Sequence, residues 1–295
     1  MLRTKDTTIN SITLILATVL SLAFTQVTAQ DFNKGVEAAH AGDFATALKE
    51  WQPLAEQGNA LAQYNLGWMY ENDTGVPKDY AEAVKWYRIA AEQGNAAAQY
   101  NLGVMYLNGT GVLKDYAEAV KWYRIAAEQG NAAAQYNLGF MYLNGTGVLK
   151  DATKAVKWYQ LSAKQGNAAA QNNLGWIYEN DTGVLKDYAE AVKWYRLAAE
   201  QGHAAAQINL GTKYLNGTGV LQDYAEAVKW YRIAAEQGHA TAQFNLGFMY
   251  VNGTGVLKDS TKAVKWYQLS AKKGNAAAQN NLGAMYEIGT GVLKD

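Results

Sequence analysis

The chain repeats itself with a period of 36 residues. The pair Leu-Gly recurs seven times without slippage, at residues 66–67, 102–103, 138–139, 174–175, 210–211, 246–247 and 282–283. A fixed period of this length is typical of a solenoid, in which each unit buries its apolar face only by stacking on its neighbours. The period therefore predicts a stacked array of similar units.

Local signals within one unit predict a first helix that ends at a glycine-rich turn. Ala98, Leu102 and Tyr106 lie at positions i, i+4 and i+8, the spacing of one helix face, and we expect this face to lie in the core. Gly109 and Gly111 follow in "NGTGVLK" and interrupt the helix.

A second helix is predicted after this turn. Asp115 is expected as its N-cap, with Glu118 three residues later as the capping-box partner, and Gly130 as its C-terminal cap. The residues between them show the apolar spacing i, i+3, i+4 and i+7 at Ala119, Trp122, Tyr123 and Ala126. Each unit is thus predicted to be a helical hairpin.

Gly103 stands inside the first predicted helix, where glycine costs about 1 kcal/mol relative to alanine. All seven units carry this glycine. We expect close approach of the neighbouring helix to offset the cost, with the ring at the position of Trp122 lying against it.

The pattern of one unit resembles the Sel-1-like repeat family, relatives of the tetratricopeptide repeat with a longer loop between the helices. The matching positions are Ala98, Leu102, Gly103, Tyr106, Gly109, Gly111, Val112, Asp115, Ala119, Trp122, Ala126, Ala127 and Gly130. The resemblance covers residues 60–295 and implies an all-α, right-handed α-solenoid of helix-turn-helix repeats. It also implies an adaptor or scaffold that holds a protein or peptide partner.

The chain divides into three parts on these signals. Residues 1–29 are expected to be a signal peptide, and residues 30–59 an N-terminal capping hairpin that lacks the glycine-rich loop. The repeat array follows, with units at 60–95, 96–131, 132–167, 168–203, 204–239, 240–275 and, incomplete, 276–295.

The first 29 residues have the layout of a secretory signal peptide. Arg3 and Lys5 precede an apolar run from Ile12 to Phe24, which is short for a membrane span of roughly 20 residues. We expect cleavage after Ala29, no integral membrane segment afterwards, and a periplasmic or secreted protein of bacterial origin. An uncleaved anchor is the alternative.

Asp295 has the sequence position of an N-cap whose helix does not follow. Leu282 and Tyr286 would then lack their partner helix. Either the sequence is a fragment, or this open edge docks onto another molecule, self-association being one form of such docking.

Composition excludes several classes of function. Lys plus Arg equals Asp plus Glu at 26 each, so no basic surface for nucleic acid is expected. The chain has no cysteine, and its three histidines show no clustered spacing, so we expect no metal site and no cofactor. The few residues that break the repeat, such as Lys213, form no catalytic constellation. Six Asn-x-Thr sequons fit the turn chemistry of the loop better than glycosylation.

Three positions of the first helix vary most between units, and they are spaced i, i+4 and i+7 on one face. We call this face the variable stripe, and we expect it to line a concave groove that binds the partner. Its candidate contact residues are Tyr64, Trp68, Tyr100, Val104, Leu107, Tyr136, Phe140, Leu143, Trp176, Phe244 and Phe248. The competing interpretation is that young duplicates drift wherever packing is tolerant, and that these positions are partly buried.

The sequence therefore favours a non-enzymatic interaction scaffold in the cell envelope or outside it, acting in signalling, complex assembly or host interaction. A carbohydrate- or cell-wall-binding module that stacks sugars on the same aromatic residues is the alternative. An envelope hydrolase is the third hypothesis, for which the sequence nominates no residue.

Overall fold

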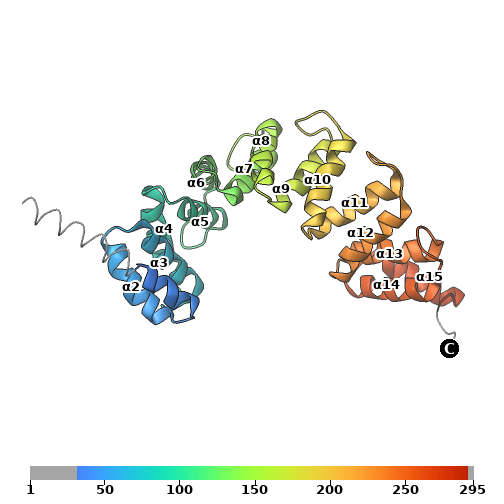
Figure 1. Ribbon diagram of the computed structural model, residues 1–295, viewed down its shortest axis with the longest axis horizontal. Helices are drawn as coiled ribbons and strands as arrows, with labels where there is room; N and C mark the ends of the chain where they lie inside the picture. Colours follow the sequence, from blue (N-terminus) through green and yellow to red (C-terminus); the bar gives the residue numbers. More distant parts are fainter. Residues whose placement is uncertain (1–31, 292–295) are drawn as a thin grey trace, which may run out of the picture. The chain divides into compact units, whose positions relative to one another are not determined.

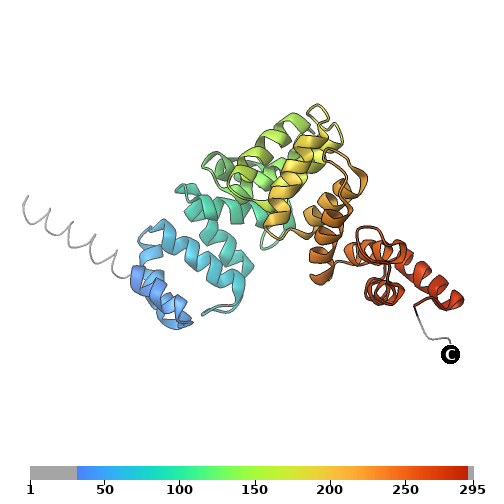
Figure 2. The same ribbon diagram turned by 45° about the vertical axis from the view of Figure 1, so that its right-hand side comes forward.

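The computed structural model describes residues 32–291, a range that contains helices and turns but no strand. The expected signal peptide lies outside the described residues. The chain divides into two compact units, residues 1–131 and 132–295. In each unit, helices that are consecutive in sequence pack side by side (Figures 1 and 2). The all-α solenoid of helical hairpins is confirmed.

Unit 1 contains a helix over residues 32–40 and five labelled helices. These are α2 (Phe44–Glu56), α3 (Ala60–Asn72), α4 (Tyr80–Glu92), α5 (Ala96–Asn108) and α6 (Tyr116–Glu128). The pairs α3–α4 and α5–α6 are the hairpins predicted for the repeats.

Unit 2 contains four complete hairpins and one further helix within the described range. They are α7 (Ala132–Asn144), α8 (Ala152–Lys164), α9 (Ala168–Glu179), α10 (Tyr188–Glu200), α11 (Ala204–Asn216), α12 (Tyr224–Glu236), α13 (Ala240–Asn252), α14 (Ser260–Lys272) and α15 (Ala276–Ile288). No helix among residues 32–291 is both long enough and apolar enough to cross a bilayer.

The helix ends explain why each unit folds into a hairpin. The Asn95 side chain accepts a hydrogen bond from the Ala98 amide at 2.9 Å and so starts α5. Gly109 ends α5 in the left-handed conformation, with φ of 72°. The Asp115 side chain then starts α6 by accepting from the amides of residues 117 and 118.

The expected capping box is only half present. The Asp115 amide, which a capping-box glutamate would bind, donates instead to the carbonyl of Tyr106 at 3.0 Å. Glu118 is therefore available to pair with Lys121, at 3.1 Å. The prediction of Asp115 as the N-cap is confirmed. The prediction that Glu118 accepts a hydrogen bond from the Asp115 amide is wrong.

The core of each hairpin is made of small and medium apolar side chains. Ala98 and Leu102 are fully buried, as expected, together with Met105. Tyr106 is only half-buried, because its hydroxyl accepts a hydrogen bond from Arg88 of the preceding repeat at 2.6 Å. The tyrosine thus links two repeats at the border of the core.

The glycine inside the first helix is explained by a tyrosine ring, not by the tryptophan expected from the sequence. A Cβ atom added to Gly103 would lie 2.7 Å from Cδ1 of Tyr123, which is fully buried. Gly67, Gly175 and Gly247 meet the equivalent tyrosine in the same way. Close helix approach is confirmed, with the neighbouring position on α6 supplying the ring.

Buried glutamines connect successive hairpins. The side-chain amide of Gln63, 3% exposed, donates to the carbonyl of Ala55 in the preceding helix at 3.0 Å. Its oxygen accepts from the side chain of Gln93 at 2.6 Å. The same arrangement recurs in later repeats, where the buried glutamines Gln99 and Gln207 are bonded in the same way through both their amide group and their oxygen.

Candidate partner-binding surface

The first position of the variable stripe is half-buried and packs on the core. The rings of Tyr64 and Tyr100 lie 5.8 and 5.9 Å from the buried rings of Tyr87 and Tyr123. In unit 2, Tyr136 and Phe244 each lie 5.7 Å from the equivalent tyrosine. These rings therefore contribute to hairpin stability as well as to the surface.

The second position presents large aromatic side chains to solvent. Trp68 is 38% exposed in unit 1, and Phe140, Trp176 and Phe248 are 46–49% exposed in unit 2. Val104 is half-buried at the same position. Exposed rings that the core does not need are the strongest candidates for contact with a partner.

The third position is apolar in some repeats and acidic in others. Leu107 and Leu143 are half-buried there, and Glu71 and Glu179 replace them in other repeats. The Tyr87 hydroxyl donates to Glu71 at 2.6 Å, and the Tyr195 hydroxyl donates to Glu179 at 2.9 Å. Burial raises the pKa of both tyrosines far above the ordinary value, so each remains a neutral donor.

A hollow of about 240 Å³ lies where the stripe passes from one repeat to the next in unit 2. Its walls come from three consecutive helices, α13, α14 and α15. The lining residues are Phe248, Val251, Asn252, Tyr267, Asn281, Ala284 and Met285. Residues at the second and third positions of the stripe thus share one concave site with the buried tyrosine.

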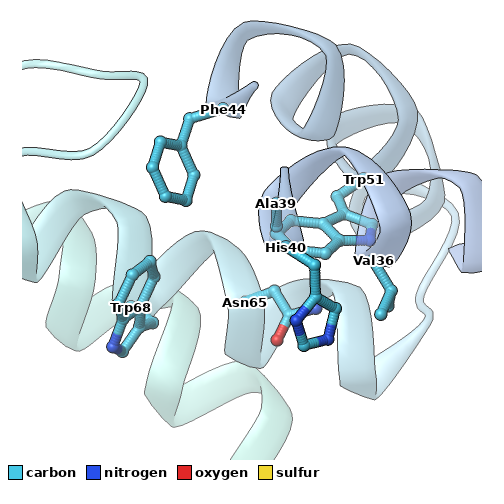
Figure 3. Close-up of a pocket in the computed structure, with 7 residues that line it drawn as sticks. All are labelled: Val36, Ala39, His40, Phe44, Trp51, Asn65 and Trp68. Atoms are coloured by element: carbon cyan, nitrogen blue, oxygen red, sulfur yellow. The ribbon is translucent and has the colours of Figure 1, made fainter. Parts of the chain in front are cut away.

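A hollow at the equivalent place lies near the start of unit 1 and has a volume of about 320 Å³ (Figure 3). It is lined by Val36, Ala39, His40, Phe44, Trp51, Asn65 and Trp68. Trp51 occupies the position of the buried tyrosine of the later repeats, since its ring lies against Gly35. The rings of Phe44 and Trp68 are 6.2 Å apart at this hollow. The site is therefore a feature of the junction between hairpins.

The structure places the predicted stripe in two parts, one in each unit. Unit 1 carries the residues Tyr64, Trp68, Tyr100, Val104 and Leu107. Unit 2 carries Tyr136, Phe140, Leu143, Trp176, Phe244 and Phe248. Within a unit the hollows bring stripe positions of adjacent repeats together.

Lys213 is a buried residue that contacts the stripe from within the fold, although in the sequence it is only a break in the repeat pattern. It stands where other repeats have Met105 or Met285, and its side chain is 7% exposed. Its ammonium group forms an ion pair with Glu179 and lies 5.7 Å from the centre of the Tyr188 ring. A single-letter change in an apolar column was the available signal.

A row of exposed leucines was also missed. Every glycine-rich loop of the form "GVLKD" or "GVLQD" within residues 32–291 presents a leucine that is 88–92% exposed. The residues are Leu113, Leu149, Leu185, Leu221 and Leu257. They lie outside the variable stripe and contribute no burial to the fold.

No group of three or more potential metal ligands comes together among residues 32–291. Two of the acidic side chains of the stripe, Glu71 and Glu179, are each bonded to a tyrosine hydroxyl. Neither lies beside a side chain that would act as a nucleophile. The chemistry available at the stripe is that of recognition by aromatic, apolar and acidic groups.

The sequence matches the family model described as "Sel1 repeat" seven times, over residues 60–95, 96–131, 132–167, 168–203, 204–239, 240–275 and 276–295. No curated protein matches it. The chain is similar to the crystal structure of a protective antigen from uropathogenic Escherichia coli strains that displays an SLR fold, with 39% identity and a TM-score of 0.87. That match covers 95% of this chain and 61% of the E. coli chain, so this chain spans under two thirds of that protein.

A second solved structure, a Sel1 repeat protein from Oxalobacter formigenes, is 38% identical with a TM-score of 0.74. The match covers 82% of this chain and 99% of the other. Both similarities agree with the hairpin repeats described above.

Proposed function

We propose that this chain, which belongs to the Sel1 repeat family, is a non-enzymatic scaffold that binds a protein or peptide partner along its variable stripe. Sel1 repeat proteins generally mediate protein–protein interaction and are typically non-enzymatic. The finer part of the proposal, the binding surface, rests on the geometry of this chain.

The observation that carries the proposal is the exposure of the second stripe position. Four large rings, of Trp68, Phe140, Trp176 and Phe248, are 38–49% exposed. Trp68 and Phe248 each line a hollow at a hairpin junction. Tryptophan and other aromatic side chains dominate binding hot spots when they enter a partner's pocket. Because several repeats each contribute one ring, a long peptide or a protein surface can make contact at more than one junction.

The test is affinity capture with chain from Gln30 onward as bait, incubated with envelope and secreted extracts. The stripe variant carries Trp68→Ser, Phe140→Ser, Trp176→Ser and Phe248→Ser. It leaves intact the half-buried rings that pack on the core, so its helicity should match the parent. A protein that the parent captures and the folded stripe variant loses supports the proposal.

The exposed loop leucines provide a matched control. The variant Leu113→Ser, Leu149→Ser, Leu185→Ser and Leu257→Ser removes the same number of exposed apolar side chains from another surface. It should capture the partner as well as the parent does. Equal loss in both variants would mean that the captured protein responds to general hydrophobicity, and it would contradict a specific stripe.

Two other outcomes would replace the scaffold hypothesis. Retention of the parent on cell-wall glycan, with no captured protein and little effect of salt, would support the carbohydrate-binding alternative, in which the rings of Trp68 and Trp176 stack on sugars. Turnover of an envelope component that one polar substitution abolishes would support a hydrolase.

Export is part of the proposal and is supported by the sequence of residues 1–29. We propose a periplasmic or secreted bacterial protein whose mature chain begins at Gln30. Mass spectrometry of the N-terminal peptide after expression in a bacterial host, with cell fractionation, tests this directly. An uncleaved chain recovered with the membrane would show that the segment is an anchor.

A further inference from the structure

The junction between the repeats over 60–95 and 96–131 combines an acidic and an aromatic side chain on the variable stripe. Trp68 and Glu71 lie at i and i+3 on α3, the spacing at which side chains are neighbours on a helix. They are equivalent to Phe248 and Val251, two lining residues of the hollow in unit 2. The junction thus places a carboxylate where the hollow in unit 2 has the apolar side chain of Val251.

We propose that this junction binds a cationic side chain, lysine or arginine, of the protein partner through the carboxylate of Glu71 and the ring of Trp68. The proposal rests on the scaffold function above and specifies the chemistry of the partner at one place. A cation over a tryptophan ring is attracted by the ring's quadrupole, and a carboxylate adds an ion pair.

The chain itself contains an example of the ion-pair part of this recognition. At the equivalent junction in unit 2, Glu179 accepts from the Tyr195 hydroxyl on Oε2 and from the ammonium group of Lys213 on Oε1. Trp176 precedes Glu179 by three residues, as Trp68 precedes Glu71. The same tryptophan, glutamate and tyrosine recur in sequence, and a lysine is already present. The ring that the Lys213 ammonium group contacts is that of Tyr188, so this junction is a precedent for the role of the carboxylate, and the role of the tryptophan ring is the new part of the proposal.

At Glu71 the lysine is missing. Tyr87 donates to Oε2 of Glu71, as Tyr195 does to Glu179, but Met105 replaces the lysine. Within residues 32–291, Oε1 of Glu71 has no hydrogen-bond or ion-pair partner, and this atom is not fully buried. One oxygen is thus fixed by the protein and the other is open to an incoming donor.

The contrast between the two junctions predicts which cation is bound and where. Lys213 neutralises Glu179 from within the fold, so the Trp176 junction has little remaining attraction for an external cation. The Trp68 junction keeps its charge, and the tyrosine hydroxyl holds the carboxylate in place at low entropic cost.

The experiment follows the indole N–H signals of Trp68 and Trp176 by nitrogen-15 NMR, each assigned with its tryptophan-to-phenylalanine variant. The probes are N-acetyl-lysine methylamide, N-acetyl-arginine methylamide and the uncharged N-acetyl-norleucine methylamide. We expect the lysine or arginine probe to shift the Trp68 signal saturably and to leave Trp176 unmoved. Equal shifts with the norleucine probe, or none with either cation, would overturn the proposal.

Two reciprocal substitutions sharpen the test. Lys213→Met gives unit 2 the residue found at position 105 and should add a saturable response at Trp176. Met105→Lys should neutralise Glu71 and abolish the response at Trp68. If one of these variants does not fold, the other still tests the proposal. The remaining indole signals show whether each variant is folded.

Glu71→Gln keeps the shape of the site and removes its charge. It should weaken binding of the cationic probe by up to about fivefold, because one partly exposed ion pair contributes up to about 1 kcal/mol. Unchanged binding would refute the role of the carboxylate. If the stripe captures a protein while the cationic probes leave the Trp68 signal unmoved, the cation site is refuted and the scaffold function stands. If the probes shift the Trp68 signal while the stripe captures no protein, the cation site stands and the scaffold function is refuted.

Discussion

One junction of the array carries a defect whose repair should stabilise the protein. In the preceding hairpins a glutamine at the end of the second helix donates to the buried glutamine of the first, at 2.6–3.2 Å. In the repeat over 240–275 that donor is Lys273, whose ammonium group binds the carbonyl of Gly238 instead. The side-chain oxygen of Gln243 is left without a partner, although the residue is 3% exposed.

The substitution Lys273→Gln restores the donor. An unpaired buried acceptor costs about 1–3 kcal/mol, while the lysine–carbonyl bond that is lost lies at the exposed surface and contributes less. We therefore expect the free energy of unfolding of unit 2 to rise by about 1 kcal/mol. The amide of Gln243 already donates to Ala235 at 3.1 Å, so no other bond has to change.

Urea unfolding followed by circular dichroism measures this effect as a shift in midpoint at constant slope. The mirror variant Gln201→Lys moves the same defect to the repeat over 168–203, where Gln201 now donates to Gln171 at 2.6 Å. It should lower stability by a similar amount. If Lys273→Gln is neutral while Gln201→Lys is destabilising, a water already satisfies Gln243 and the calculation above is refuted.

Three further predictions concern unit 2. Gly175→Ala should lower the free energy of unfolding by about 1–3 kcal/mol, because its Cβ would lie 2.6 Å from a buried tyrosine ring. Gly283→Ala has no neighbouring atom within 4 Å of its Cβ and should be neutral or stabilising. The midpoints of urea unfolding measure both effects. Lys213→Met should be neutral or stabilising, and Glu179→Gln destabilising by up to about 3 kcal/mol, since it strands a buried ammonium group; equal effects of the two would contradict this. Burial lowers the pKa of His203, so the unfolded chain takes up a proton more readily and stability should fall as the pH drops below 6.5; His203→Asn should flatten this dependence.

The fold was predictable because each repeat contains the residues that start and end its two helices. Asp115 and Gly109 specify where helices start and end, and the structure has them in those roles. Gly103 signalled a close approach, but the approaching ring could not be identified from spacing alone. Trp122 and Tyr123 are adjacent on the second helix, and only the crossing geometry decides which of them faces the glycine.

The site was less predictable because exposure within one helix face is a property of the stack. Tyr100 and Phe140 both belong to the variable stripe, yet one packs on a core ring and the other is 49% exposed. The interpretation that some stripe positions are partly buried therefore holds for the rings of the first position and for Val104, and it does not hold for the large rings of the second position.

Lys213 shows why the contacts of a repeat protein must be compared at each junction as well as at each repeat position. A lysine in a methionine column reads as drift when the column is considered alone. Placed beside Glu179, it neutralises one acidic junction and distinguishes it from the otherwise similar junction at Glu71. Two repeats that differ at few residues thus differ in charge at the variable stripe. If the stripe binds a partner as proposed, near-identical hairpins offer it unequal sites, and a partner that carries one cationic side chain would be held in a single register at the junction of Glu71.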